Sequence, residues 1–222
     1  GKGCKIKNGK KREVSADVVL VAVGRRPVAS GFGLEKTGVK VSDRGFIEVD
    51  DQLRTNVPHI FAVGDVVGGA MLAHKASHEG ELVAEIVHGK NRVNDVRSIP
   101  NVVFTEPEIA SAGLGEEEAK AAGHELNIGK FPFAASGRAM AIQETTGFVK
   151  VLTDAKDNRV LGVHLVGPEA SDLISEGSLA IEMGAFAEDI SLTIHPHPTL
   201  SEAVMEAAKH AIGEAVHVMN KS

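Results

Sequence analysis

Hydrophobic residues near the start of the chain occur in continuous runs rather than at alternating positions. Residues 18–23 (VVLVAV) are apolar throughout, and a second largely apolar run, residues 59–65 (HIFAVGD), ends on Asp65. Strands buried on both faces, as in the parallel sheets of α/β domains, have this pattern. We therefore predict two buried strands, each ending at the sheet edge where such domains bind ligands, and a helix over about residues 71–88.

A short hairpin is predicted ahead of the first run. Asn8-Gly9 is the strongest two-residue signal for a tight turn between antiparallel strands. The basic residues around it are Lys2, Lys5, Lys7, Lys10, Lys11 and Arg12. We interpret them as the solvated surface of an edge hairpin rather than as a binding site.

From about Val96 the pattern changes to short apolar segments separated by turn residues. The predicted strands are 102–104, 126–133, 148–153 and 160–166, the predicted helices are 116–122, 172–183 and 200–219, and turns are expected at Gly113, Ser136-Gly137 and Asp157-Asn158. Strands that follow one another without crossover helices are typical of an antiparallel sheet. The predicted fold class is α+β, an antiparallel sheet flanked by helices and preceded by α/β segments. The expected divisions are 1–27, 28–95 and 96–222.

The composition argues against nucleic-acid binding, membrane insertion and an intrachain disulfide. The chain has 222 residues, 43% of them hydrophobic and 24% charged, with a net charge of −6. The acidic balance argues against nucleic acid as a partner. The longest apolar run is far shorter than the roughly 18 residues that span a bilayer, and no leader sequence is recognisable, so we expect neither export nor membrane anchoring. The single cysteine, Cys4, excludes an intrachain disulfide and suits a reducing compartment.

Residues 195–202, which read HPHPTLSE, bring two histidines and a glutamate close together in the sequence. Each proline fixes its own φ and disfavours the α region for the residue before it, so His195 and His197 are held on an extended segment. Apolar residues at helical spacing follow, which places Glu202 in the first turn of a helix close to His197. A rigidly placed imidazole beside a carboxylate is suited to act as a general base.

Two other interpretations of this segment are open. Thr199 and Glu202 have the spacing of a capping box, in which the glutamate accepts the backbone N–H of the threonine, and spacing alone does not separate this role from a catalytic one. The two histidines also suggest zinc, but no CxxC or HExxH motif completes a ligand set. We therefore predict no metal site.

Two positions at the predicted strand ends are also open to two interpretations. Asp65 is either a turn residue before a helix or an acceptor for a chain of sugar-like hydroxyls. Gly24 either permits the strand-to-loop turn or lets a ligand approach the backbone. Gly68 and Gly69 allow the same close approach just after Asp65.

Four stretches together resemble one enzyme family. HPHPTLSEA resembles the C-terminal signature of the dihydrolipoamide dehydrogenase family of flavoprotein disulfide reductases. Residues 59–80, 99–113 and 162–185, which read HIFAVGDVVGGAMLAHKASHEG, IPNVVFTEPEIASAG and GVHLVGPEASDLISEGSLAIEMGA, are similar to the same family. The resemblance extends from about Val18 to the end of the chain, and these motifs look more like the lipoamide branch than the glutathione reductase branch.

The resemblance implies a role for individual residues. His197 matches the active-site base of the family, and Glu202 matches the carboxylate that orients it. Asp65 matches the residue that contacts the ribityl part of FAD, and Gly24 would lie near the nicotinamide dinucleotide. The residues that would line the flavin are Met71, Leu72, Ala73 and His74. Related reductases also carry a cis peptide bond at the matching His-Pro, so we predict one at His197–Pro198.

The resemblance also assigns the expected divisions and shows what is missing. Residues 1–27 would be the end of an NAD-binding domain, 28–95 the returning FAD-domain segment, and 96–222 the interface (dimerisation) domain. The Gly-rich phosphate-binding turn and the paired cysteines of the family are absent. We therefore expect the C-terminal part of such an enzyme, inactive alone and retaining neither cofactor.

The implied parent enzyme oxidises protein-bound dihydrolipoamide with FAD and NAD⁺. Its expected partners are a second identical subunit, whose disulfide the His-Glu dyad would serve, and the dihydrolipoyl acyltransferase component of 2-oxo-acid dehydrogenase complexes. The expected location is the cytoplasm, or the mitochondrial matrix in a eukaryote. Alternative interpretations are a non-catalytic dimerisation module and a fragment of a glutathione-reductase-like enzyme.

Overall fold

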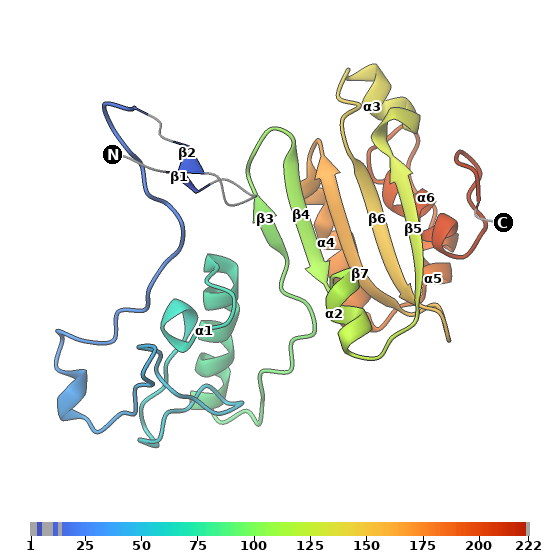
Figure 1. The fold of residues 1–222 in the computed structure, drawn as a ribbon. Helices are drawn as coiled ribbons and strands as arrows, with labels where there is room; N and C mark the ends of the chain where they lie inside the picture. The colour runs from blue at the N-terminus through green and yellow to red at the C-terminus, as the bar shows by residue number, and fades with distance from the viewer. Residues whose placement is uncertain (1–3, 6–10, 13–14, 221–222) are drawn as a thin grey trace. The chain divides into compact units, whose positions relative to one another are not determined.

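The computed structural model describes residues 4–5, 11–12 and 15–220 (Figure 1). The chain divides into two compact units, Gly1–Ala84 and Glu85–Ser222, and each is described by itself. Across these described ranges, no helix is both long and apolar enough to cross a membrane.

The second unit is built on a five-stranded sheet in the order β3-β4-β7-β6-β5. Its strands are β3 (Asn101–Val103), β4 (Glu108–Gly113), β5 (Leu126–Pro132), β6 (Phe148–Asp154) and β7 (Val160–Gly167). All neighbouring strands run antiparallel. The predicted α+β class is therefore confirmed.

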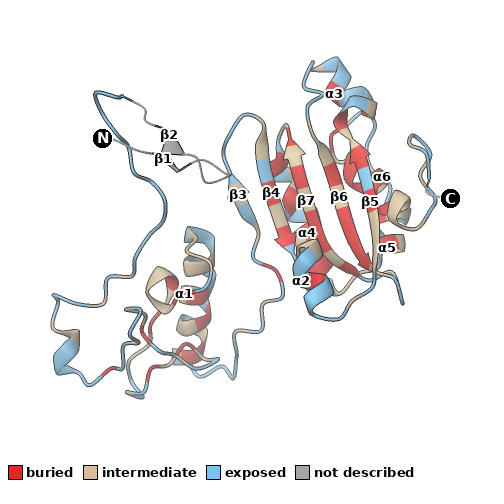
Figure 2. Cartoon of the chain, in the orientation of Figure 1, coloured by how far each residue is buried: buried red, intermediate tan, exposed pale blue. Residues whose placement is uncertain are grey.

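Several helices belong to this unit. They are α2 (Glu116–Ala121), α3 (Gly137–Ala141), α4 (Ala170–Met183), α5 (Ala187–Leu192) and α6 (Glu202–Ala211). Helices α4 and α6 cover the same face of the sheet (Figure 1), α4 over β4 and β7 and α6 over β5 and β6. The inner face of β6 and β7 is apolar, and Val149, Val151, Val163 and Leu165 are fully buried there (Figure 2). This apolar layer is the main core of the molecule.

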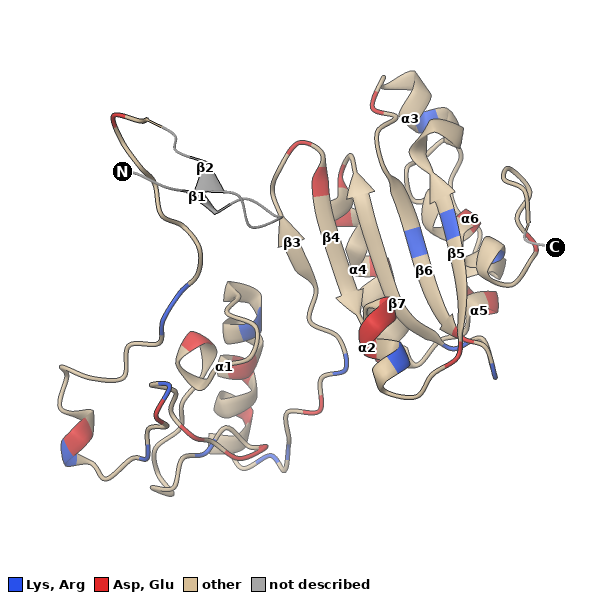
Figure 3. Ribbon diagram, viewed as in Figure 1, with Lys and Arg blue, Asp and Glu red and all other residues tan. Residues whose placement is uncertain are grey.

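The opposite face of the sheet carries a row of polar side chains. Ser111, His164, Lys150 and Lys130 face one another in register across four strands. The basic positions on β5 and β6 and the acidic start of α2 are visible in Figure 3, and the Lys150 ammonium lies 2.7 Å from the Glu116 carboxylate. Lys150 and His164 thus place polar side chains on the face of the sheet opposite the buried Val149, Val151, Val163 and Leu165.

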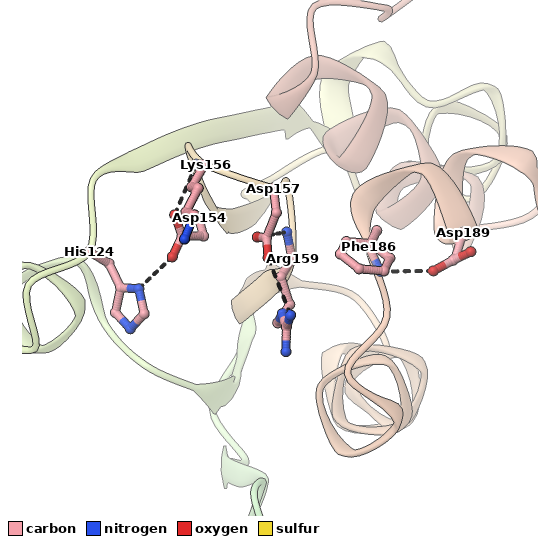
Figure 4. Close-up of polar contacts among 7 residues, drawn as sticks. All are labelled: His124, Asp154, Lys156, Asp157, Arg159, Phe186 and Asp189. Atoms are coloured by element: carbon pink, nitrogen blue, oxygen red, sulfur yellow. Dashed lines mark hydrogen bonds and ion pairs between the residues drawn. The ribbon is translucent and has the colours of Figure 1, made fainter.

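The turn between β6 and β7 is fixed by side chains. The Asp154 carboxylate accepts a hydrogen bond from His124 Nδ1 at 2.6 Å, and Asp157 pairs with Arg159 at 3.2 Å (Figure 4). Asn158 adopts a positive φ of 62°, which Asn tolerates better than most residues. The turn predicted at Asp157-Asn158 is confirmed.

Besides the short 3₁₀ helix η3 (Phe133–Ala135), three elements of this unit were not predicted. Strand β4 has one large apolar side chain, Ile109, and buries only alanines, so its hydrophobic signal is weak. Helix α3 begins after Ser136, whose hydroxyl accepts the Ala139 N–H. Helix α5 begins after Phe186, whose N–H is accepted by Asp189 (Figure 4). Both helices have fewer than two turns, too short for a clear periodic pattern.

The helix predicted over 200–219 is shorter in the structure, because α6 ends at Ala211. Gly213 has a left-handed φ of 78° that turns the chain out of the helix. The buried Glu206 carboxylate then accepts the backbone N–H groups of Val216 and His217 at 3.3 and 3.2 Å. The last residues therefore fold back onto α6 instead of extending it.

The first unit contains less regular structure. Strands β1 (Cys4–Lys5) and β2 (Lys11–Arg12) pair antiparallel as the predicted hairpin requires, and its turn at Asn8-Gly9 lies outside the described residues. The 3₁₀ helices η1 (Leu34–Lys36) and η2 (Gly64–Val67) precede α1 (Ala73–Val87), which confirms the helix predicted near 71–88.

The two buried strands predicted in this unit are wrong. Residues 18–23 form no strand and lie exposed, with Leu20 89% and Val23 93% exposed. Residues 59–65 make a single isolated bridge at Phe61 and then enter η2. A strand needs a neighbour for its backbone groups. None of the described residues provides one for 18–23, and 59–65 makes only short contacts, in which Thr55 donates to the Ile60 carbonyl and Ala62 to the Leu53 carbonyl.

Candidate functional site

The two oxygens of the Glu202 carboxylate have different partners. Oε2 accepts the Thr199 backbone N–H at 2.8 Å, and Oε1 lies 2.9 Å from Nδ1 of His197. A second hydrogen bond fixes Thr199, because its hydroxyl donates to the Pro196 carbonyl at 2.7 Å. The capping and orienting roles are therefore compatible, and the structure brings the predicted pair His197 and Glu202 into contact.

This contact decides which nitrogen of His197 is available. An ionised carboxylate only accepts hydrogen bonds, so Nδ1 must be the donor and a neutral ring keeps its lone pair on Nε2. The His197 side chain is 78% exposed, whereas that of Glu202 is 25% exposed. The result is an accessible basic nitrogen on a ring whose tautomer and orientation are fixed from its other side.

Ionisation of Glu202 is favoured by its surroundings. Partial burial acts to raise its pKa, but the hydrogen bonds from the Thr199 N–H and from His197 outweigh burial and hold the pKa below its ordinary value. Glu202 is therefore charged at neutral pH and can stabilise a protonated His197.

His195 occupies a different environment from His197. Its side chain is only 5% exposed, Nδ1 lies 2.9 Å from the Thr193 carbonyl, and Nε2 lies 2.7 Å from the Glu176 carboxylate on α4. Both ring nitrogens are thus occupied by neighbouring oxygens. His195 joins the extended segment to α4, and His197 alone of the two presents a free nitrogen.

The peptide bond that follows His197, His197–Pro198, is cis, as predicted.

Asp65 lies in the first unit, in the 3₁₀ helix η2. Its side chain is 43% exposed, and its carboxylate is 3.7 Å from the Arg25 guanidinium, which also donates to the Met71 carbonyl at 3.1 Å. Gly68 and Gly69, just after the turn, have left-handed φ values of 86° and 70°. Asp65 therefore offers partly exposed carboxylate oxygens next to two glycines whose φ values few other residues adopt.

The other candidate cofactor residues lie near the start of α1 or before Arg25. Met71 and Leu72 precede the helix and are partly buried, while Ala73 and His74 form its exposed first turn. Gly24 has a φ of 153°, and no atom lies within 4 Å of a Cβ placed on it. Among the residues that the structure describes, no group of three His, Cys, Asp or Glu side chains could hold a metal ion.

Two family models match the chain. The dimerisation domain of the pyridine nucleotide-disulphide oxidoreductases matches residues 99–208, and the pyridine nucleotide-disulphide oxidoreductase model matches residues 1–80. The chain belongs to the pyridine nucleotide-disulphide oxidoreductase family. The His197–Glu202 pair lies within the part matched by the dimerisation domain.

Curated relatives in this family include two bacterial dihydrolipoyl dehydrogenases. The protein from Geobacillus stearothermophilus is 51% identical over 214 residues, which are 96% of this chain and 46% of the relative. The protein from Bacillus subtilis is 51% identical over 211 residues, 95% of this chain and 45% of the relative. The chain thus spans about half the length of the curated relatives it matches.

Solved structures of the family have the same fold. The HOCl-induced flavoprotein disulfide reductase RclA from Escherichia coli aligns with a TM-score of 0.81 at 28% identity, over 91% of this chain and 46% of RclA. LpdA from Mycobacterium tuberculosis aligns with a TM-score of 0.81 at 28% identity, over 91% of this chain and 44% of LpdA.

The sequence did not predict three residues that hold His195 and the turn before Asp65 in place. Glu176, the partner of His195, is 19 positions away in the sequence. Lys75 and Glu79 lie four residues apart on α1, and this spacing is a signal that could have been read as an ion pair. The spacing of Lys75 and Glu79 does not show that both side chains also contact the backbone of Gly64.

Proposed function

We propose that this chain is part of a dihydrolipoyl dehydrogenase, which oxidises protein-bound dihydrolipoamide to lipoamide with NAD⁺. The observation that carries the proposal is the His197–Glu202 contact, with one exposed basic nitrogen, in a chain 51% identical to such enzymes. A general base with this geometry suits a reaction that begins with the loss of a thiol proton.

His197 supplies the proton transfer. A free thiol has a pKa of about 8.5, and only its thiolate is nucleophilic. Nε2 of His197 takes the proton of a dihydrolipoamide thiol, and the thiolate attacks a disulfide through a mixed-disulfide intermediate. The ring is then an imidazolium with both N–H groups as donors, and the ionised Glu202 stabilises its charge at 2.9 Å. A positioned base contributes on the order of 10² to 10⁴ in rate.

The cofactor residues of the proposal lie in the first unit. Asp65 would accept hydrogen bonds from the ribityl hydroxyls of FAD, and its exposed carboxylate next to two glycines with left-handed φ fits that chemistry. Met71, Leu72, Ala73 and His74 would lie along the flavin, and Gly24 would lie near NAD. FAD, when bound, supplies the two-electron chemistry that links the dithiol to NAD⁺.

The proposed partners follow from the dimerisation domain. Two identical chains would pair through residues 99–208, so that His197 of one chain serves the disulfide of the other. The dihydrolipoyl acyltransferase component of a 2-oxo-acid dehydrogenase complex would supply the lipoyl group. Such an enzyme would work in the cytoplasm or, in a eukaryote, in the mitochondrial matrix.

Substrate preference tests this proposal. A full-length enzyme that carries this sequence should form NADH from dihydrolipoamide and NAD⁺, whereas the 222-residue chain alone should not, because it contains a single cysteine. Reduction of glutathione disulfide by the full-length enzyme, with no oxidation of dihydrolipoamide, would assign it to the glutathione reductase branch instead.

A further inference from the structure

Helix α1 contains a buried ion pair that the proposed chemistry does not use. The Lys75 ammonium lies 2.8 Å from Oε1 of Glu79, and the two side chains are only 9% and 3% exposed. Removing two charges from water is unfavourable unless further hydrogen bonds compensate. The partners of this pair outside the helix therefore indicate what it does.

Both side chains contact the backbone of one residue, Gly64. Oε2 of Glu79 accepts the Gly64 N–H at 2.7 Å, and the Lys75 ammonium donates to the Gly64 carbonyl at 3.3 Å. Gly64 is itself buried, with a left-handed φ of 81°. A Cβ at this position would lie 3.0 Å from the Ala76 Cβ, so the turn packs directly on α1. The pair thus fixes the backbone immediately before Asp65.

Stabilising helix α1 does not by itself explain the Lys75–Glu79 ion pair. Ion pairs four residues apart stabilise a helix best when the glutamate precedes the lysine, and here the order is reversed. Among the described residues, the other backbone contacts around the turn, from Thr55 to Ile60, Ala62 to Leu53 and Ile47 to Val66, come from segments that form no more than isolated bridges. The contacts to Gly64 are consequently the main polar link between this turn and a regular element.

We propose that Lys75 and Glu79 are positioning residues that hold the turn carrying Asp65 in the conformation that receives a polyhydroxyl chain. This inference rests on the cofactor role proposed above for Asp65. By fixing the turn in advance, the pair reduces the ordering that a ligand must impose when it binds.

Hydrogen exchange in the 222-residue chain tests the contacts without any cofactor. In K75M/E79L, which leaves no unpaired charge and no acceptor for Gly64, exchange over residues 60–68 should be at least about tenfold faster, the ratio expected for losing one hydrogen bond to a charged group. In K75M/E79Q the amide oxygen replaces the acceptor, so protection should be largely restored. A role in helix stability alone predicts no such rescue, because Leu is as good a helix former as Gln.

A control is available at the C-terminal end of the same helix. Glu85 of α1 pairs with Lys90, which lies just beyond the helix, at 2.7 Å and with Arg92 at 2.9 Å, and these side chains are more exposed than those of Lys75 and Glu79. K90M/E85L should leave exchange over residues 60–68 unchanged. Loss of protection along the whole of α1 in K75M/E79L would assign the Lys75–Glu79 pair to the helix and overturn the proposal.

Flavin affinity of the full-length enzyme then separates this inference from the proposed function. D65A should weaken FAD binding, and K75M/E79L should weaken it by about tenfold, with K75M/E79Q between it and the unsubstituted enzyme. Unchanged FAD affinity in D65A would contradict the cofactor role of Asp65. Weakened binding in D65A together with unchanged binding in K75M/E79L would overturn only the positioning role.

Discussion

At the scale of single residues, Glu202 links the start of a helix to the orientation of an imidazole. The same carboxylate closes the first turn of α6 through Thr199 and holds Nδ1 of His197. Spacing in the sequence predicted both contacts but could not decide between them, because whether one carboxylate reaches both partners depends on the path of the chain at Pro196 and Pro198. The partner of His195 could not be predicted, since Glu176 belongs to another helix.

Glu202→Gln separates the two tasks of Glu202. Gln can still accept the Thr199 N–H, so the melting temperature should change little, since loss of a cap costs only about 1 kcal/mol even when complete. Loss of the negative charge beside the imidazolium should lower turnover of the full-length enzyme at least about tenfold and alter its pH profile. Steady-state kinetics and melting curves check this, and wild-type turnover in the variant would restrict Glu202 to helix capping.

His195→Gln should affect folding more than chemistry. The imidazole is buried and bonded at both nitrogens, to Thr193 and Glu176, so removing it leaves the Glu176 carboxylate without its partner. We expect a lower melting temperature, and a smaller loss of turnover than in His197→Gln or Glu202→Gln. A larger loss of turnover in His195→Gln than in His197→Gln would reverse the assignment of the base.

At the scale of elements, the second unit follows its sequence pattern closely and the first unit does not. Strands β5, β6 and β7 find partners within the described chain, so their apolar pattern leads directly to a buried sheet face. The equally apolar run 18–23 has no such partner, and it lies exposed. Local pattern predicts that a segment favours a strand, but a strand forms only where a neighbour completes its hydrogen bonds.

Contact between α6 and β5 leaves no room for a side chain at Gly129. A Cβ there would lie 1.8 Å from the Ala207 carbonyl oxygen and 2.5 Å from the Ala211 nitrogen. Gly129→Ala should therefore destabilise the second unit by about 1 to 3 kcal/mol, as overpacking typically does. Gly137→Ala is the matched control, because its Cβ would meet nothing within 4 Å and should be neutral or slightly stabilising. Urea denaturation of the two variants would contradict this packing if they proved equally stable.

His164 on β7 makes the stability of the sheet depend on pH. Burial lowers its pKa from the ordinary value of 6.5, helped by the charge of Lys150 and opposed by the hydrogen bond to the Leu114 carbonyl and by Glu116 and Glu118. Because the unfolded chain binds the proton more readily, the contribution of His164 to stability is present above pH 6.5 and is lost as pH falls towards the folded pKa.

Calorimetry checks the sign of this effect. The melting temperature of the chain should fall between pH 7.5 and 5.5, and it should fall less in His164→Gln, which lacks the titrating ring. Equal decreases in the two proteins would exclude His164 as a source of the pH dependence.

At the scale of the whole molecule, the chain contains the base of the proposed reaction but a single cysteine, so the disulfide that His197 would serve has to come from elsewhere in the enzyme. The match of residues 99–208 to a dimerisation domain supports a partner subunit as the place where base and disulfide meet. The same domain should make the isolated chain a two-fold dimer, with a mass by light scattering of about twice 23.3 kDa. A monomer at micromolar concentration would contradict this.

Mixed dimers of the full-length enzyme test most directly whether His197 acts as the base across the subunit interface. One subunit carries His197→Gln and the other lacks the redox cysteines, so each homodimer should be nearly inactive. In a mixed dimer, the intact His197 of one subunit faces the intact disulfide of the other, and one of the two sites should oxidise dihydrolipoamide at the normal rate. Recovery of about half the wild-type turnover per dimer is the expected result. If the mixed dimers bind flavin and have the mass of a dimer but are as inactive as the two homodimers, His197 does not act across the subunit interface.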